Sequence, residues 1–364
     1  MSCSSRAAML QAALLFREST TSRTAVGRRL FDKLSSSYRP CRRCISTSSP
    51  PRRREDGRDG GSHQLVNNPF ARDFGKYDKV KLGNVTTVER KIPDHIQKPD
   101  YWKTGHPNLQ LGARTIEIKK PESIDKMRNA CLLARKVLNA AVKQVKPGMT
   151  TEDIDDFVFN YTIQQGAYPS PLNYRNFPKS VCTSVNNVAC HGIPDDRKLV
   201  DGDVINIDVM VYIDGFHGDC STTVGVGNVD EMGLKLLEAA KACLDYGVMV
   251  CAPGVPFQRI GQTIEDVAEE KGFTVVPCFT GHGIGHQIHA APDIYHIDYP
   301  YPGKMEVGMT FTVEPVLTQG MENIVVLEDG WTAVTLDGAR TAQFEHTILI
   351  TDYGAEILTL PEND

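Results

Sequence analysis

Two stretches of the chain show the same order of a helical pattern, a turn and a second helix. Residues 123–146 carry apolar side chains at helical spacing. Pro147-Gly148 ends this pattern, and a second predicted helix begins near Thr151. The apolar positions of the first predicted helix are Ile124, Met127, Cys131, Leu138, Val142 and Val145.

The same order recurs 106 residues further along. Pro147-Gly148 corresponds to Pro253-Gly254, and the acidic residue Asp208 corresponds to Glu314. Several matches on a single offset predict two similar α+β halves related by a pseudo-two-fold axis. The other matching pairs are Leu138 with Leu244, Val142 with Val248, Ile154 with Ile260, and Gly202 with Gly308.

A β-hairpin is predicted over residues 203–221. The residues on either side of Asp214-Gly215 alternate and are rich in β-branched side chains, and Asp-Gly is a strong two-residue turn signal. This turn places Ser221 opposite Asp208, so that Asp208 and Asp219 become diagonal neighbours on one face of the sheet.

Three predicted strands contain an acidic residue in apolar surroundings. Asp208 follows Ile207, Glu314 lies within residues 310–317, and Glu345 lies within residues 341–350. Such acids can lie on the solvent-facing side of an amphipathic strand. Burial of an unpaired carboxylate, however, costs several kcal/mol or neutralises the group. Three such strands together with the hairpin pair favour a bound cation.

Histidine supplies a further candidate ligand. The segment 281–286 holds His282 among too many glycines for an ordinary strand or helix, so its backbone approaches something closely or takes positive φ. The segment lacks the GxGxxG spacing of a phosphate loop. His191 lies in a similar His-Gly-Ile sequence, and its neighbour Cys190 points to the opposite side of an extended chain, which disfavours a Cys-His dyad.

Charge and composition limit the classes of partner that the chain is expected to bind. The net charge is −5, but residues 1–54 carry twelve Lys and Arg against two acids, which leaves the remainder at −15. The body is therefore not expected to bind nucleic acid. No run of eighteen apolar residues occurs, so no membrane span is expected. The ten cysteines are scattered and are interpreted as reduced thiols, with the CxxC at Cys41 and Cys44 incidental.

The basic N-terminal segment is interpreted as an organelle transit peptide. It is rich in Arg and Ser, and residues 6–17 could form a short basic amphipathic helix. A mitochondrial destination is expected, with a plastid as the alternative. The predicted organisation is a transit peptide or disordered segment over residues 1–60, an irregular N-terminal extension outside the core over 61–112, and a catalytic domain over 113–360.

Several motifs in order resemble those of type I methionine aminopeptidases, in particular the mitochondrial form. They are the segments 92–101, 167–171, 177–182 and 190–194. The resemblance covers about residues 92–360. It implies the α+β pita-bread fold, in which two pseudo-two-fold-related α+β halves surround a central antiparallel sheet with a dinuclear metal site.

The resemblance also implies the chemistry. Two divalent ions, Co, Mn, Fe or Zn, would activate a water that removes the N-terminal initiator methionine. His289 would contact the substrate amide, His191 would line the methionine site and assist the leaving nitrogen, and Glu314 would also shuttle a proton. The implied metal ligands are Asp208, Asp219, His282, Glu314 and Glu345.

A snug apolar pocket for methionine and a tight next subsite are implied as well, so a small second residue is expected to be preferred. A monovalent cation loop would correspond to Asn186, Val188 and Thr341. The residues expected to bind substrate, besides His191 and His289, are Pro171, Tyr174, Phe177, Cys182, Ile288 and Trp331.

The chain departs from the family pattern at four places without losing a ligand. Tyr174-Arg175-Asn176 replaces a Gly-rich stretch, and Ile288 replaces a common Phe. Met210 and Cys220 stand where the family commonly has Thr, and Met210 removes a hydroxyl that could orient Asp208.

Two other functions fit parts of the pattern. A proline-specific peptidase of the same fold would carry an additional N-terminal domain, for which residues 55–110 are too short. A non-enzymatic binding member of the fold would typically have lost metal ligands. The expected partners are N-terminal peptides of nascent proteins, with a functional link to peptide deformylase, and the enzyme is expected to be a monomer.

Overall fold

The computed structural model describes residues 73–86, 89–108 and 115–360. All of them belong to the unit formed by residues 58–364. The predicted transit peptide lies outside the described residues. Within the described part, no helix is long and apolar enough to span a bilayer.

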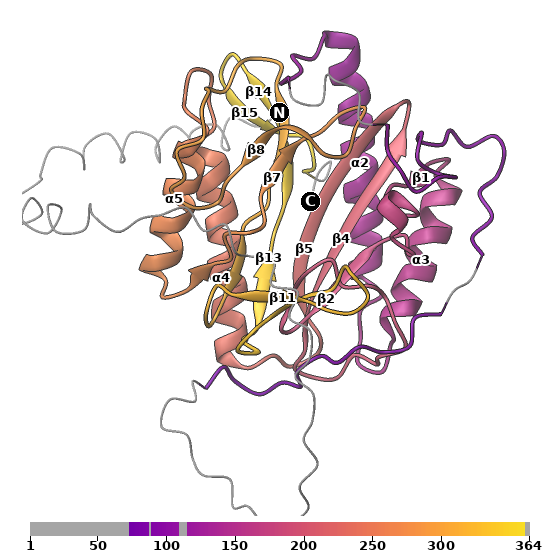
Figure 1. Cartoon of the computed structure of the whole chain (residues 1–364), viewed down its shortest axis with the longest axis vertical. Helices are drawn as coiled ribbons and strands as arrows, with labels where there is room; N and C mark the ends of the chain where they lie inside the picture. Colours follow the sequence, from indigo (N-terminus) through magenta and orange to yellow (C-terminus); the bar gives the residue numbers. More distant parts are fainter. Residues whose placement is uncertain (1–72, 87–88, 109–114, 361–364) are drawn as a thin grey trace, which may run out of the picture. The chain divides into compact units, whose positions relative to one another are not determined.

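The first half of this unit packs two helices beside a long hairpin. Helix α2 contacts both strands of the β4–β5 hairpin, and α3 lies next to α2 (Figure 1). Their buried apolar side chains form one core cluster that includes Leu138, Ile154 and Ile207. The elements are α2 (Pro121–Val142), α3 (Thr151–Gln164), β1 (Tyr168–Pro169), the 3-10 turn η5 (Tyr174–Asn176), β2 (Cys182–Val185), β3 (Val188–Cys190), β4 (Val204–Ile213) and β5 (Phe216–Gly225).

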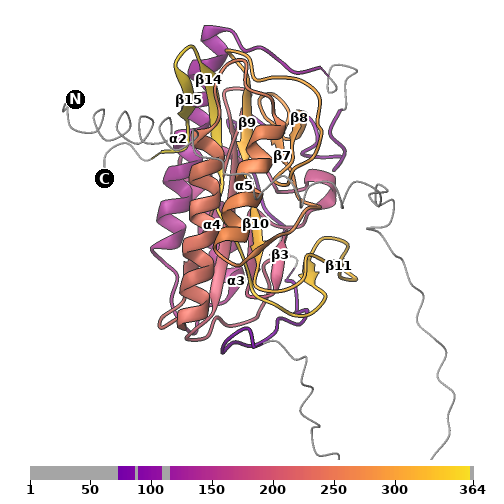
Figure 2. The same cartoon turned by 90° about the vertical axis from the view of Figure 1, so that its left-hand side faces the viewer.

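The second half repeats two helices followed by strands, and all four helices lie on the same face of the strands (Figure 2). Its core cluster includes Leu244, Ile260 and Phe311. The elements are α4 (Glu231–Met249), α5 (Gln258–Glu270), β6 (Thr274–Val275), β7 (Gly281–Gly283), β8 (Ala290–Ile294), β9 (Thr310–Val313), β10 (Val316–Thr318), β11 (Ile324–Val326), β12 (Ala333–Thr335), β13 (Thr341–Gln343), β14 (His346–Thr351) and β15 (Gly354–Ile357).

The predicted duplication is present in the hydrogen bonding. Gly148 N donates to Leu199 O at 2.7 Å, and at an offset of 106 Gly254 N donates to Met305 O at 2.8 Å. These two glycines have φ of 85° and 80°, a left-handed conformation that glycine adopts without steric cost. The two halves therefore repeat backbone geometry as well as element order, as the sequence predicted.

Within the described ranges, the strands are antiparallel wherever they pair and form four small sheets. Their orders are β1-β4-β2 with β5 on β4, β13-β10-β6, β11-β12-β3, and β15-β14-β9-β7-β8. The halves meet where β5 faces the β13–β14 segment. There Glu345 N donates to Ser221 O at 3.2 Å, and Thr347 Oγ1 donates to Asp219 O at 2.8 Å.

The first helix is shorter than the sequence pattern predicted. It ends at Val142, because Gln144 N and Val145 N bond to carbonyls three residues back and tighten the chain into turns before Pro147.

The N-terminal extension is irregular, as predicted, but the prediction that it lies outside the core is wrong. Ile96 and Tyr101 are each only 2% exposed, and they pack with Tyr168, Tyr174 and Ile288. Tyr101 Oη also donates to Ser170 O at 2.7 Å. This segment carries no periodic signal, because its side chains are buried one at a time and it forms no helix or strand.

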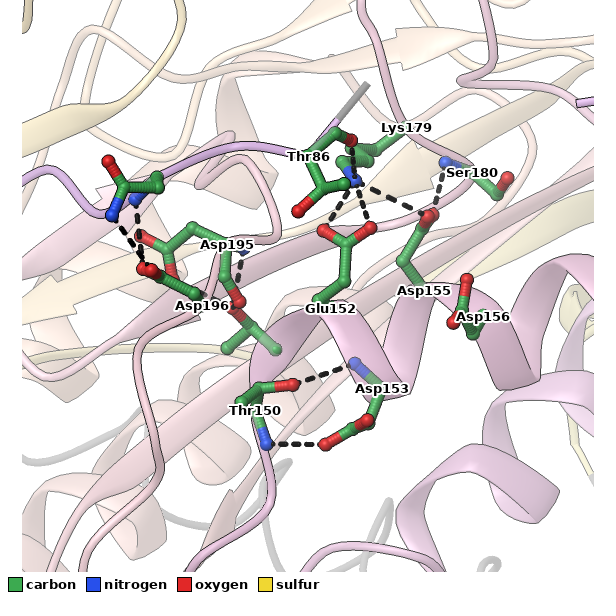
Figure 3. A network of polar contacts seen from close by, with 12 residues as sticks. Thr86, Thr150, Glu152, Asp153, Asp155, Asp156, Lys179, Ser180, Asp195 and Asp196 are labelled. Atoms are coloured by element: carbon green, nitrogen blue, oxygen red, sulfur yellow. Dashed lines mark hydrogen bonds and ion pairs between the residues drawn. The ribbon is translucent and has the colours of Figure 1, made fainter. Parts of the chain in front are cut away.

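An acidic cluster at the start of α3 anchors this extension to the body (Figure 3). Lys179 Nζ donates to Thr86 O at 2.8 Å and pairs with Glu152. Arg90 Nη2 lies 2.5 Å from Asp155 Oδ2, and Asp155 Oδ1 accepts from Ser180 N at 2.6 Å. Because cations already neutralise the cluster, we interpret it as a structural clamp that holds the 177–182 segment in place.

We predict that Tyr101→Ala lowers the free energy of unfolding by about 3–5 kcal/mol, the usual cost of truncating a buried aromatic side chain. Urea denaturation of the purified protein measures this change. Tyr353→Ala is the matched control, because Tyr353 is 100% exposed and its loss should change stability by less than about 0.5 kcal/mol. Equal effects of the two substitutions would contradict the placement of Tyr101 in the core.

Candidate metal centre

The predicted hairpin has the predicted register. Asp208 pairs with Ser221 and Met210 pairs with Asp219 across β4 and β5. Asp214 and Gly215 form the loop with φ of 54° and 85°, the positive pair that a type I′ turn requires. Asp208 and Asp219 therefore project from the same face of the hairpin, as expected.

The second half contributes the other three candidate ligands. His282 lies on β7, Glu314 directly follows β9, and Glu345 lies between β13 and β14. His282 Nε2 is 3.7 Å from Asp219 Oδ2 and 3.5 Å from Glu314 Oε1. Ligand atoms of Asp219, His282 and Glu345 all lie within 4.8 Å of one another. The structure brings all five residues to one pocket.

Four carboxyl groups in one buried place repel one another's charges. Burial raises the pKa of Asp208 to about 7 and that of Glu314 to about 8. Burial, with repulsion by the neighbouring carboxylates, raises the pKa of Asp219 and of Glu345 well above the usual range. The protein alone therefore disfavours the ionised form of this cluster.

A divalent metal fits these residues. Within the described residues, the buried atoms Asp208 Oδ1 and Asp219 Oδ1 have no hydrogen-bond partner. His282 Nδ1 lies 3.2 Å from Gly283 O, and since a carbonyl only accepts, Nδ1 carries the hydrogen. The Nε2 lone pair is then directed at the carboxylates. Oxygen-rich ligands with one oriented imidazole suit Mn, Fe, Co or Zn.

Three neighbours of Glu314 were not predicted. Thr312 Oγ1 donates to Glu314 Oε1 at 2.7 Å, and Gln343 Nε2 donates to Oε2 at 3.2 Å. His296 Nε2 accepts from Glu314 N at 3.1 Å. Thr312 and Gln343 each precede a candidate ligand by two residues, so strand alternation could have identified them. The sequence carries no comparable signal for His296.

Most of the expected substrate residues line the same pocket, which has about 460 Å³ of space including its open mouth. Ile288 does not line it. Its side chain is 2% exposed and packs against Tyr101 and Tyr174, while the next residue, His289, faces the pocket. Met210 lines the pocket, which the sequence did not predict. The lining residues besides the five candidate ligands are Pro171, Tyr174, Phe177, Cys182, His191, Met210, His289 and Trp331.

Aromatic contacts fix the two candidate catalytic histidines. Tyr174 Oη lies 2.8 Å from His289 Nδ1, and the His289 ring centroid is 4.3 Å from that of His282. The His191 ring meets Trp331 edge to face at 5.9 Å, and its backbone has φ of 57°. Both imidazoles therefore border the carboxylate cluster at defined positions.

The residues expected to form a monovalent cation loop are also neighbours. Thr341 Oγ1 donates to Asn186 O at 3.1 Å and to Val188 O at 2.8 Å. Asn186 is held by its own side chain, because Nδ2 donates to Asp203 Oδ1 at 2.7 Å and Oδ1 accepts from Val204 N at 3.0 Å. Two carbonyl oxygens and a hydroxyl therefore converge at one point.

Comparisons with known proteins agree with this geometry. The model of metallopeptidase family M24 matches residues 125–352. Human "Methionine aminopeptidase 1D, mitochondrial" is 50% identical over 290 residues, covering 80% of this chain and 86% of the relative. "Methionine aminopeptidase 1D, chloroplastic/mitochondrial" of Arabidopsis thaliana is 49% identical, covering 78% and 81%.

Solved structures give the same result. The crystal structure of methionine aminopeptidase from Rickettsia prowazekii is 41% identical, has a TM-score of 0.67, and covers 68% of this chain and 100% of its own. The prolidase from Pyrococcus furiosus, 22% identical with a TM-score of 0.55, covers 68% of this chain and 66% of its own and shares the fold.

The fold and the site together define a metallopeptidase of the pita-bread class. The chain belongs to metallopeptidase family M24.

We predict that Asp219→Asn has opposite effects with and without metal. Metal-free, the variant should be more stable than the wild type by about 1–3 kcal/mol, because Asn is neutral in this cluster without having to take up a proton. The wild type should gain about 2.7 kcal/mol when Mn or Co is present at 100 times its dissociation constant, and the variant should lose most of this gain. Thermal unfolding with chelator and with metal measures both changes.

Asp155→Asn is the control, since Asp155 is also a buried acid but pairs with Arg90. It should destabilise the protein by about 3–5 kcal/mol in both conditions while leaving the metal-induced shift intact. A metal-free Asp219→Asn protein that loses stability in the same way would contradict a cation requirement at the cluster.

Proposed function

We propose that this protein is a methionine aminopeptidase that removes the initiator methionine from nascent proteins. The observation that carries the proposal is a pocket with apolar walls that ends at the carboxylate and imidazole cluster. The activity named for relatives that cover most of the chain supports it.

We propose that Asp208, Asp219, His282, Glu314 and Glu345 hold two divalent ions, Co, Mn, Fe or Zn. Bound there, the ions would supply Lewis-acid activation of a water and polarisation of the scissile carbonyl. Glu314 would take the proton of the attacking water and return it to the leaving amine. Its hydrogen bonds from Thr312 and Gln343 orient both carboxylate oxygens for this transfer.

The two histidines would act on the substrate peptide. His289 would bind the scissile amide through Nε2, because Nδ1 is engaged with the Tyr174 hydroxyl. His191, beside Trp331 in the pocket wall, would assist the leaving nitrogen. Both roles need an imidazole in a fixed orientation, which the aromatic neighbours provide.

The pocket walls would select methionine. Pro171, Tyr174, Phe177, Cys182 and Trp331 surround the space with apolar groups, and Phe177 meets Trp331 edge to face at 5.1 Å. Such a pocket discriminates by about 1–3 kcal/mol per methylene. A small residue after methionine would be preferred because the next subsite would be tight.

A monovalent cation bound by Asn186, Val188 and Thr341 would connect β13 to the 186–188 loop. The carbonyl oxygens of Asn186 and Val188 already converge on the Thr341 hydroxyl and could serve as ligands of the cation.

We further propose a mitochondrial location, with a plastid as the alternative, because curated relatives of both descriptions match. Residues 1–60 would then be the transit peptide, residues 61–112 the extension and 113–360 the catalytic domain. The enzyme would act as a monomer on N-terminal peptides.

The activity is tested with peptides on residues 65–364 reloaded with Co or Mn. We expect methionine release from Met-Ala-Ser, much less from Met-Lys-Ser, and no cleavage of Ala-Pro-Ser. Glu345→Ala and chelation should each abolish release, because each removes part of the metal site. Mass spectrometry of the products measures the outcome.

Cleavage of Ala-Pro-Ser instead would favour a proline-specific peptidase. Stoichiometric metal without turnover of any of the three peptides would favour a binding role.

A link to a deformylase follows if the organelle initiates translation with formyl-methionine. We expect formyl-Met-Ala-Ser to resist the enzyme until it is treated with a peptide deformylase, because the pocket would require a free amino group. Equal cleavage of formylated and free peptides would rule this link out.

A further inference from the structure

The rim of the pocket beside Tyr174 has an unusual backbone. Asn173, Arg175 and Asn176 have φ of 61°, 48° and 66°, although none is glycine. Asn adopts this left-handed region at little cost, whereas the longer side chain of Arg175 is strained there by the closeness of Cβ to the backbone. Strained non-glycine residues cluster at active sites and ligand-binding segments.

The strained segment presents one cation to solvent. Arg175 is exposed, and its Cζ lies 5.5 Å from the ring centroid of Tyr174, whose own side chain lines the pocket. Its charge also lowers the pKa of the Tyr174 hydroxyl against the larger upward effect of burial, because the guanidinium lies close to that hydroxyl.

The Arg175 guanidinium has no acidic partner among the described residues. Four other arginines in this part of the chain, Arg90, Arg128, Arg197 and Arg340, each pair with a carboxylate within 3.1 Å, whereas Arg135 and Arg259 form no such pair. A guanidinium is suited to bidentate binding of a carboxylate. Arg175 contacts Tyr174 but no carboxylate among the described residues, so it offers a carboxylate-binding group at the mouth of the site.

Arg175 lies within reach of a bound peptide. The Tyr174 ring centroid is 5.3 Å from that of His289, and we have proposed that His289 binds the scissile amide. An extended peptide advances about 3.4 Å per residue. With the 5.5 Å from this ring to Arg175 Cζ, the guanidinium therefore lies no further from His289 than about three extended residues.

We propose that Arg175 is a specificity-determining residue that binds an acidic side chain at the second or third position after the scissile bond. This inference rests on the proposed aminopeptidase function. Arg175 selects among substrates that already carry methionine and a small second residue. The charge pair is exposed, so its effect is modest and is screened by salt.

The test compares amidated peptides Met-Ala-Xaa-Xaa-Ser-Gly with Asp, Asn or Lys at both Xaa positions. Amidation leaves side-chain carboxylates as the only acidic groups. At low salt the metal-loaded enzyme should favour Asp over Lys by about threefold to tenfold in kcat/KM, chiefly through KM. The ratio should fall towards one in 1 M salt, where the Debye length is about 3 Å.

Variants assign the preference to this side chain. Arg175→Gln should reduce the Asp-to-Lys ratio to about one, and Arg175→Glu should invert it. Arg175→Gly should also remove the preference while relieving the backbone strain, so its thermal stability should not fall. Arg259→Gln is the matched control, because Arg259 is exposed at the start of α5 and its loss should leave the ratio unchanged.

The outcomes separate this inference from the proposed function. Methionine release with an Asp-to-Lys ratio near one, or with a ratio that Arg175→Glu does not change, would overturn the role of Arg175 alone. Failure to release methionine from every peptide, with metal bound, would overturn the aminopeptidase proposal. Metal-dependent thermal shifts equal to the wild type identify variants that are folded.

Discussion

Placing four carboxyl groups in one buried pocket costs free energy, and the arrangement of the two halves around the pocket depends on how this cost is met. Each group would be ionised in water, yet here burial and mutual repulsion oppose ionisation. A divalent cation removes that opposition, and the surrounding protein must then hold the ligands at separations that suit the ion. The seam between β5 and the β13–β14 segment meets this need, since Glu345 N and Thr347 Oγ1 bond across it to the backbone of the strand that bears Asp219.

The duplication supplies the scaffold but only part of the chemistry. Asp208 and Glu314 occupy equivalent positions in the two halves, and each approaches the centre from its own half. The offset of 106 does not extend to Asp219, because it maps Asp219 onto Val325, which is 41% exposed. The strands that pair with β9 and β10 as β5 pairs with β4 are β14 and β13, on either side of Glu345. The second half instead contributes His282 and Glu345. Two similar halves have therefore kept a common backbone while their side chains diverged to form one asymmetric site.

The convergence of the five candidate ligands on one pocket could be predicted because their signals were local. An acid inside an apolar strand and an Asp-Gly turn depend on neighbouring residues, and the turn alone sets the register of Asp208 and Asp219. Ile288 shows the limit of this reasoning. Its position in a motif suggested the pocket, but its side chain packs in the core because Tyr101 arrives from the distant extension.

Other contacts between distant segments were not predicted either, because they also depend on residues far apart in the sequence. The burial of Tyr101 and the hydrogen bond from Glu314 N to His296 both depend on how irregular segments cross the body. Buried residues of helices and strands recur at fixed intervals in the sequence, and these intervals can be recognised. Contacts made by irregular segments have no such interval.

The extension also influences the order in which the chain can reach its native state. Tyr77 Oη donates to Gly338 O at 2.5 Å, and Arg340 Nη2 donates to Phe74 O at 2.8 Å, so residues made early contact residues made almost last. Closing loops of this length is entropically slow. During synthesis on a ribosome, residues 74–77 emerge long before residues 338–340. They can therefore form these hydrogen bonds only when nearly the whole unit has been synthesised.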